Sequence, residues 1–224
     1  KTMQAIGVAL VLSSSRILIV CPASLRLNWT RELSLWWPER SSDICLVEEC
    51  GTKAARGIVI VNYDKVVGAS AAAKAIRATL DNGQWALVVL DEAHLLKNPD
   101  AQRTNYFFGS YKRGQKVGSG LVDRTQRVLW LTGTPIQNKV RESLSLLRAI
   151  GAIGGSPDAV SADEGKFLFR YCGAQRGDYG WTFDGATNLE ELQAKLRAGW
   201  MVRRLKVQVA TELPPKLRTV FYLP

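Results

Sequence analysis

Residues 87–94 read Leu87-Val88-Val89-Leu90-Asp91-Glu92-Ala93-His94: four apolar residues, two adjacent carboxylates and the only histidine of the chain. An apolar run of this length is typical of a strand buried on both faces of a parallel sheet. Asp91 and Glu92 then lie at the carboxyl end of the strand, where open α/β sheets bind ligands. Such a pair suits a nucleotide-hydrolysing site, with one acid for magnesium and one for water. An acidic start to a helix is the purely structural alternative.

The composition limits the class of protein. The chain has 224 residues, 46% of them hydrophobic, and a formal charge of +10 from 30 basic and 20 acidic residues. One large folded domain with appendages fits these values. The basic excess favours a polyanion such as nucleic acid, or is a solvated surface. The four scattered cysteines lack zinc-site spacing and indicate reduced thiols in an intracellular protein.

Short apolar runs alternate with helical patterns along the chain. The expected strands are residues 17–21, 44–47, 57–62, 86–91 and 128–132. The expected helices include residues 3–12, 25–36, 71–80, 102–108 and 139–150. This alternation predicts a parallel sheet covered by helices on both faces.

Three further segments complete the outline. Residues 5–12 are too short for a membrane span and indicate a buried helix, so no membrane partner is expected. Residues 109–127 are rich in Gly, Lys and Arg, which predicts an exposed basic loop. Three glycines within residues 151–157 separate the α/β body from shorter helices that follow.

Three motifs carry a family resemblance. They are Asp-Glu-Ala-His at 91–94, Leu-Thr-Gly-Thr-Pro-Ile-Gln-Asn at 131–138 and Cys-Pro-Ala-Ser-Leu at 21–25. In type, order and spacing they resemble motifs II, III and Ia of superfamily 2 helicases. The Thr-Gly-Thr-Pro form resembles Swi/Snf-type DNA translocases, whereas RNA helicases of the DEAD and DEAH groups usually carry Ser-Ala-Thr there.

Both ends of the chain extend this resemblance. Residues 1–6 (Lys-Thr-Met-Gln-Ala-Ile) resemble the end of a Gly-x-Gly-Lys-Thr P-loop, so we expect a fragment that lacks the P-loop glycines. Residues 169–172, 180–181, 185–186 and 188–192 are similar to the annealing-helicase branch, which remodels forks in DNA repair. Residues 201–206 and 213–216 resemble the family's passage toward a second motor lobe.

The resemblance implies an α/β fold: a RecA-like parallel sheet flanked by helices, which is the first motor lobe of a P-loop NTPase, with a C-terminal helical extension. We expect the ATP-binding lobe at residues 1–150 and the extension at 151–212. An extended passage toward the second lobe is expected at 213–224.

The resemblance also implies catalytic and nucleotide-binding roles. Asp91 is expected to contact Mg²⁺ through water, and Glu92 to orient or deprotonate the attacking water. Lys1 is expected to bind the phosphates, and Thr2 to bind Mg²⁺ together with Asp91.

Two further groups are expected to join ATP hydrolysis to DNA. The coupling residues are His94, Thr132, Gly133 and Thr134. The DNA-backbone contacts are Pro22, Ala23, Ser24 and Asn28. Ordinary turn capping is the alternative role for the threonines. Ser24 is also a candidate N-cap for helix 25–36, whereas Trp29 is expected in the core.

The implied function is an ATP-binding lobe of a DNA-dependent ATPase that translocates on or remodels DNA. ATP and Mg²⁺ are the expected cofactors; duplex or forked DNA and the second lobe of the same, monomeric, chain are the expected partners. We expect an intracellular location: nuclear in a eukaryote, cytoplasmic or nucleoid in a prokaryote or virus. The family's arginine finger belongs to the second lobe, so the fragment alone is expected to be nearly inactive. A non-catalytic nucleic-acid-binding scaffold lobe is the alternative.

Overall fold

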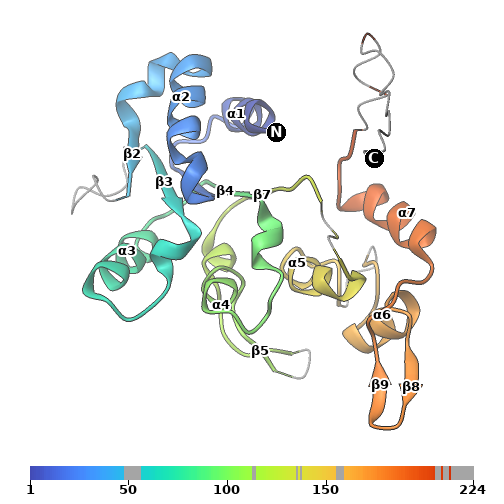
Figure 1. Cartoon of the computed structure of the whole chain (residues 1–224). Coiled ribbons are helices and arrows are strands. Elements are labelled where there is room, and N and C mark those ends of the chain that lie inside the picture. The colour runs from blue at the N-terminus through green and yellow to red at the C-terminus, as the bar shows by residue number, and fades with distance from the viewer. Residues whose placement is uncertain are drawn as a thin grey trace, which may run out of the picture.

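The fold centres on a five-stranded sheet in the order β2-β3-β1-β4-β7, and every pairing within it is parallel (Figure 1). The computed structural model describes residues 1–47, 57–112, 115–134, 136, 138–154, 159–204, 208 and 212. The strands of this sheet are β1 (Ile17–Cys21), β2 (Ile44–Leu46), β3 (Ile58–Asn62), β4 (Leu87–Asp91) and β7 (Val128–Leu131). The parallel α/β fold expected from the sequence is confirmed.

Helices cover both faces of this sheet. They are α1 (Thr2–Val11), α2 (Arg26–Trp36), α3 (Ala71–Asp81) and α4 (Gln102–Phe108). In Figure 1, α1 and α2 lie on one face, and α3 and α4 lie on the other. The side chains of β1 alternate between these two faces. Ile17 and Ile19 pack into the core with α1 and α2, whereas Leu18 and Val20 pack into the core on the opposite face. Strands buried on both faces need apolar residues at every position, which explains their continuous apolar runs.

Short 3₁₀ turns join several of these elements. They are η1 (Ala23–Leu25), η2 (Pro38–Asp43), η4 (Tyr63–Val66), η5 (Ala93–Leu96), η6 (Leu121–Arg124) and η7 (Val140–Ser143). Three of them directly follow, or begin one residue after, the carboxyl ends of β1, β3 and β4. They therefore carry the chain away from the sheet at the edge where the candidate site lies.

A third core holds the C-terminal extension together. Its elements are α5 (Leu144–Ala149), α6 (Glu164–Tyr171), α7 (Leu189–Gly199) and the hairpin of β8 (Gln175–Gly177) and β9 (Gly180–Thr182). Helix α5 joins the two parts, because Leu144 and Leu147 belong to the core of the extension while Leu146 and Ala149 pack against a core of the sheet. The extension is therefore packed onto the lobe through a shared helix.

Several expectations need correction. The helix expected at 139–150 starts as the 3₁₀ turn η7 before α5. Residues 109–127 form no simple exposed loop, because they contain the hairpin of β5 (Tyr111–Lys112) and β6 (Gln115–Lys116), and Leu121 and Val122 are buried. The passage expected at 213–224 lies outside the described residues.

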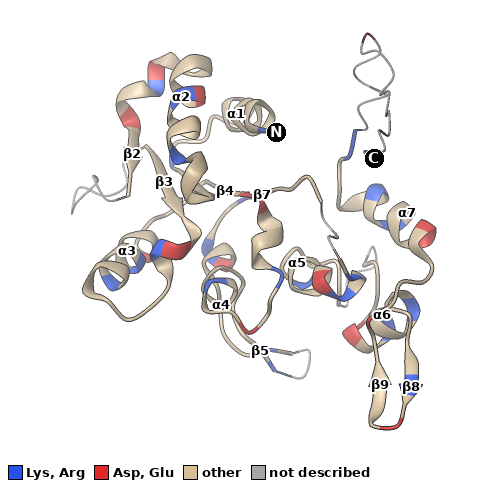
Figure 2. Ribbon diagram, in the orientation of Figure 1, with Lys and Arg blue, Asp and Glu red and all other residues tan. Residues whose placement is uncertain are grey.

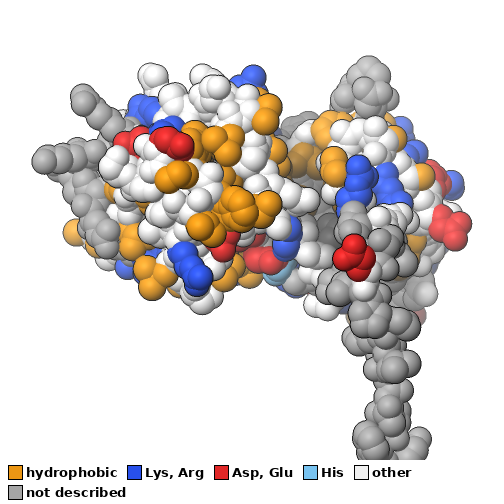
Figure 3. Space-filling view, turned by 90° about the horizontal axis from the view of Figure 1, so that it is seen from above, with side chains coloured by type: hydrophobic (Ala, Val, Ile, Leu, Met, Phe, Trp, Pro, Cys, Tyr) orange, Lys and Arg blue, Asp and Glu red, His pale blue; other side chains and the backbone are white. Residues whose placement is uncertain are grey.

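Helix α1 is buried on one side only. Ala5, Ile6 and Ala9 are buried, whereas Val8 and Val11 are exposed, so the buried helix expected from the sequence is buried on one side and not all round. The reason is the layer order, because α1 touches the sheet on one side and nothing described covers the other. Figure 3, a view from above Figure 1, shows apolar side chains gathered on this part of the surface.

The charges and cysteines add two observations. Among the described residues, Lys and Arg are spread over helices of both layers and of the extension (Figure 2). Cys21 and Cys172 are buried free thiols, but Cys45 is disulfide-bonded, which corrects the expectation of reduced thiols throughout.

In the part of the chain that the structure describes, no helix has the length and apolar character needed to cross a membrane.

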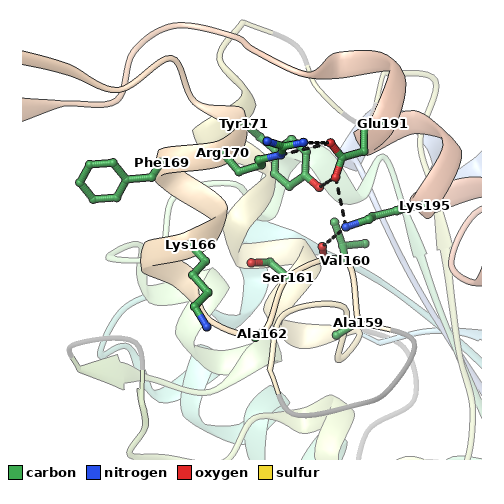
Figure 4. A pocket seen from close by; sticks show the side chains of 10 residues that line it. All are labelled: Ala159, Val160, Ser161, Ala162, Lys166, Phe169, Arg170, Tyr171, Glu191 and Lys195. Carbon is green, nitrogen blue, oxygen red and sulfur yellow. Dashed lines mark hydrogen bonds and ion pairs between the residues drawn. The ribbon is translucent and has the colours of Figure 1, made fainter.

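A carboxylate joins α6 to α7. Glu191 accepts hydrogen bonds from Arg170 at 2.6 Å and from Tyr171 at 2.9 Å, and Lys195 lies 3.2 Å away (Figure 4). These donors hold the pKa of Glu191 down to about 2. A cavity of about 550 Å³ opens beside them, and Lys166 also lines it.

The pKa of Glu191 predicts a pH dependence of stability. A depressed pKa stabilises the fold above the unfolded value near 4.5, and this contribution is lost as the pH falls toward 2. We expect Glu191→Gln to lower the free energy of unfolding at pH 7 and to differ less from the wild type at pH 3. Urea unfolding at the two pH values measures this. Glu190→Gln is the control, because the Glu190 carboxylate pairs with no described residue. An equal deficit of Glu191→Gln at both pH values would contradict the assignment.

Candidate functional site

The parallel register brings four chain segments to one edge of the sheet. Cys21 pairs with Asn62, Val20 with Leu90, and Asp91 with Leu131. Because parallel strands end at the same edge, the segments that follow β1, β3, β4 and β7 lie next to one another. Three of the four are the motifs that carry the family resemblance.

Asp91 is a buried carboxylate with both oxygens hydrogen-bonded. It is 5% exposed; its Oδ1 accepts the backbone N–H of Glu92 at 3.0 Å, and its Oδ2 accepts the indole N–H of Trp29 at 2.9 Å. The Tyr63 hydroxyl donates to the Asp91 carbonyl at 2.7 Å. Burial, and then the charge of Asp91, raise the pKa of the neighbouring Cys21 thiol to about 12. Cys21 is therefore a protonated core residue and no nucleophile.

Glu92 leaves the strand in an unusual backbone conformation. Its φ of 51° and ψ of 49° are left-handed, which costs a residue other than glycine about 1–2 kcal/mol. The Glu92 side chain is half-buried and meets two others: Lys1 Nζ lies 3.0 Å from Oε1, and His94 Nδ1 lies 3.1 Å from Oε2. Strain of this kind is common where a side chain must be aimed at a functional site.

The residues expected to couple ATP hydrolysis to DNA lie next to Glu92 and form a chain of contacts. His94 Nδ1 lies 3.2 Å from Thr132 Oγ1, which in turn accepts the backbone N–H of Thr134 at 3.2 Å. A Cβ at Gly133 would stand 3.4 Å from Lys1 Nζ, so a glycine lets the β7 loop approach Lys1 closely. The coupling residues and Lys1 thus form one connected group around Glu92.

The residues expected to touch DNA lie on the neighbouring segment after β1. Pro22 is half-buried, and Ala23, Ser24 and Asn28 are exposed. Ser24 lies inside η1, and the N-cap of α2 is Leu25 without a side-chain hydrogen bond, so the N-cap expected at Ser24 is wrong. The Leu25 N–H instead donates to the Pro22 carbonyl at 2.9 Å, which closes a 3₁₀ turn through Ser24 before the α-helix begins.

Two residues that hold Asp91 were missed from the sequence. Trp29 lies in the core, as expected, but the sequence did not predict its hydrogen bond to Asp91. The sequence predicted no role for Tyr63. The sequence signal for Tyr63 was its place directly after a buried strand, like Glu92 and Thr132. No sequence signal distinguished Trp29 from an ordinary core residue.

The donor set fits Mg²⁺ and a nucleotide. Among the described residues, no group of three or more His, Cys, Asp and Glu side chains could form a metal cage. Mg²⁺ is typically held by one or two carboxylates together with substrate phosphates, which matches the adjacent carboxylates Asp91 and Glu92, the second of them paired with Lys1. Lys1 precedes Thr2, the first residue of α1, whose helix N-terminus favours anions.

The cavity beside Glu191 is a different place. None of the predicted site residues lines it, and two of its cations, Arg170 and Lys195, are already paired with Glu191. The strand edge carries the reactive groups, and the cavity belongs to the packing of α6 against α7.

Comparison with known proteins gives a consistent result. The SNF2-related domain family matches residues 1–224. The human DNA annealing helicase and endonuclease ZRANB3 is 33% identical over 227 residues, which cover 97% of this chain and 19% of the relative. The Xenopus tropicalis SWI/SNF-related matrix-associated actin-dependent regulator of chromatin subfamily A-like protein 1 is 31% identical over 221 residues, covering 97% and 21%.

A solved structure shares the fold. The Sulfolobus solfataricus SWI2/SNF2 ATPase core in complex with dsDNA aligns with a TM-score of 0.59 and 23% identity, over 94% of this chain and 39% of that chain. The chain spans about a fifth of the length of the two relatives named above. With its whole length matched, the chain belongs to the SNF2-related domain family.

Proposed function

We propose that this chain is the first lobe of an ATP-driven motor that moves along or remodels duplex DNA, with the active site at the carboxyl edge of the sheet. The observation that carries the proposal is the pairing of Lys1 with Glu92 at 3.0 Å, beside His94 and Thr132. Residues from the start of the chain, from the end of β4 and from the end of β7 meet there, and together they offer a cation, a carboxylate and hydrogen-bonding groups. An isolated surface ion pair does not bring three separate segments together, so a catalytic site accounts better for the arrangement.

The two carboxylates have environments suited to different tasks. Asp91 is fixed and nearly buried, which suits a group that orients a bound Mg²⁺ through water. Glu92 is half-buried and more accessible, which suits a group that holds or accepts a proton from the attacking water. Mg²⁺ would neutralise phosphate charge when bound, and Lys1 and Thr2 are the residues placed to hold the nucleotide with it.

The same geometry supports coupling to DNA. When the Nδ1 of His94 carries its proton, it donates toward both Glu92 and Thr132, so a change at Glu92 reaches the loop after β7. The exposed segment from Pro22 to Asn28 follows the neighbouring strand β1 and offers backbone N–H groups and small side chains to a phosphate backbone. In our proposal this segment touches duplex or forked DNA.

The remaining parts of the proposal concern the whole protein. We place the lobe at 1–150, the extension at 151–212 and the passage to a second lobe at 213–224, in a monomeric protein that is nuclear in a eukaryote. A non-catalytic scaffold lobe would have no use for the strained Glu92 or for its contacts with Lys1 and His94. Those contacts favour the motor.

Glu92→Gln in the whole protein tests the catalytic assignment. We expect ATP turnover to fall about 10²–10⁴-fold because the amide cannot accept the proton, while ATP binding is kept. Glu142→Gln is the matched control, because Glu142 is also half-buried and paired with a lysine, Lys97 at 2.9 Å, and neither residue is among the proposed site residues. Turnover of Glu92→Gln within tenfold of the wild type would contradict the catalytic role of Glu92, and a wild-type protein without ATP turnover would favour the scaffold lobe.

Thr132→Val tests coupling, because it keeps the shape and removes Oγ1. We expect the stimulation of ATP turnover by duplex DNA to be at least about fivefold smaller in the variant than in the wild type, because fivefold is the low end of typical coupling between two sites. The affinity for DNA should be unchanged. Thr125→Val is the control, since Thr125 donates one local hydrogen bond to the Leu121 carbonyl at 3.1 Å. Unchanged stimulation in Thr132→Val would rule out this route.

The isolated 224-residue chain provides a third test. An arginine finger is worth about 10³–10⁵ in turnover, and the family's finger lies in the second lobe. We therefore expect ATP turnover by the isolated chain to be at least about a thousandfold slower than in the whole protein. Steady-state turnover with and without duplex DNA measures this, and robust DNA-stimulated turnover by the chain alone would contradict it.

A further inference from the structure

Trp29 makes a contact that a core tryptophan does not need. Its side chain is 1% exposed, and its Nε1 donates to Asp91 Oδ2 at 2.9 Å across 62 positions of sequence. We infer that Trp29 is a positioning residue for Asp91, and that through it helix α2 is joined directly to the carboxylate on the magnesium side of the site. This inference rests on the proposed function.

The hydrogen bonds leave Asp91 little freedom. Oδ1 is held by the Glu92 N–H and Oδ2 by the Trp29 indole, so rotation of the carboxylate breaks at least one bond. A carboxylate has about four lone-pair sites, and these bonds use two, which leaves the others for water around a metal ion. Hydrogen bonds of this kind orient the carboxylates of metal sites, and their removal typically costs about 10–100-fold in metal affinity.

Trp29 also connects Asp91 to the segment proposed to touch DNA. It directly follows the exposed Asn28, and α2 begins two residues after Ser24. Trp29 and Leu33 anchor α2 in the core that contains Cys21 and Leu131. A shift of α2 upon DNA contact would therefore move the indole that holds Asp91.

This connection is separate from the one through His94. His94 and Thr132 reach Glu92, whereas Trp29 reaches Asp91. Asp91 is thus linked to α2, and Glu92 to the loop after β7. The Tyr63 hydroxyl adds a third link, from η4 to the backbone of Asp91.

Trp85 shows what an ordinary buried tryptophan does in this fold. It is 2% exposed, and its indole N–H donates at 2.9 Å to the backbone carbonyl of Leu80. The two tryptophans match in burial and in hydrogen-bond length and differ in the acceptor, and the Arg16 guanidinium also lies 5.6 Å from the centre of the Trp85 ring. Trp85→Phe is therefore a matched control for Trp29→Phe, since each change removes one buried indole N–H.

The experiment compares these variants in the whole protein. The first readout is the Mg²⁺ concentration that half-saturates binding of a fluorescent ADP analogue. We expect Trp29→Phe to raise this concentration about tenfold, as losses of such hydrogen bonds to metal ligands do, and Trp85→Phe to leave it unchanged. The second readout is stimulation of ATP turnover by duplex DNA, which should fall in Trp29→Phe alone while DNA affinity is kept in both variants.

Thermal unfolding separates positioning from general damage, because both variants should lose stability to a similar degree. If Trp29→Phe does not fold, 3-benzothienylalanine at position 29 keeps the shape of the ring system and lacks only the N–H. The same tenfold shift is expected for that protein.

Each outcome decides a different claim. A wild-type protein without Mg²⁺-dependent binding of the analogue overturns the proposed function, and this inference with it. Wild-type binding combined with an unshifted Mg²⁺ dependence in the position-29 variant overturns the inference alone. An equal shift in Trp85→Phe also overturns it, because loosening of the core would then explain the effect.

Discussion

The parallel pairing of β1, β4 and β7 determines where every group of the candidate site lies. Asp91 is paired with Leu131, so Glu92 and Thr132 leave the sheet side by side. The same sheet sets the end of β1 against β4, which brings α2 over the carboxylate. A shift of one residue in this register would move each side chain to the opposite face of the sheet. The apolar packing on both faces prevents such a shift.

Two adjacent carboxylates acquire different surroundings because the chain turns sharply between them. Asp91 still belongs to the strand and lies under α2, where Trp29 holds it. Glu92 is left-handed, and this conformation directs its side chain to Lys1 and His94. One peptide unit thus separates a fixed buried acid from a more accessible one, which suits the two different roles proposed for them.

The extension is attached to the lobe by a helix that serves two cores. Helix α5 contributes Leu144 and Leu147 to the extension and Leu146 to a core of the sheet. Because these side chains come from one short helix, the two parts cannot separate without exposing apolar surface on both sides. Glu191 also links α6 to α7 within the extension, because it pairs with Arg170 of α6 and lies on the same helix as Lys195, its other partner.

The sequence by itself determined the strands, the parallel sheet and the residues of motifs II and III, because strands buried on both faces need uninterrupted apolar runs and the motifs are local in sequence. It failed for residues 109–127, where the content of Gly and Lys obscured the buried Leu121 and Val122, and at Ser24, which lies inside a 3₁₀ turn. Only the tertiary structure showed that Trp29 holds Asp91 and that Lys1 meets Glu92. These contacts join residues 62 and 91 positions apart, and no local pattern encodes the register that brings them together.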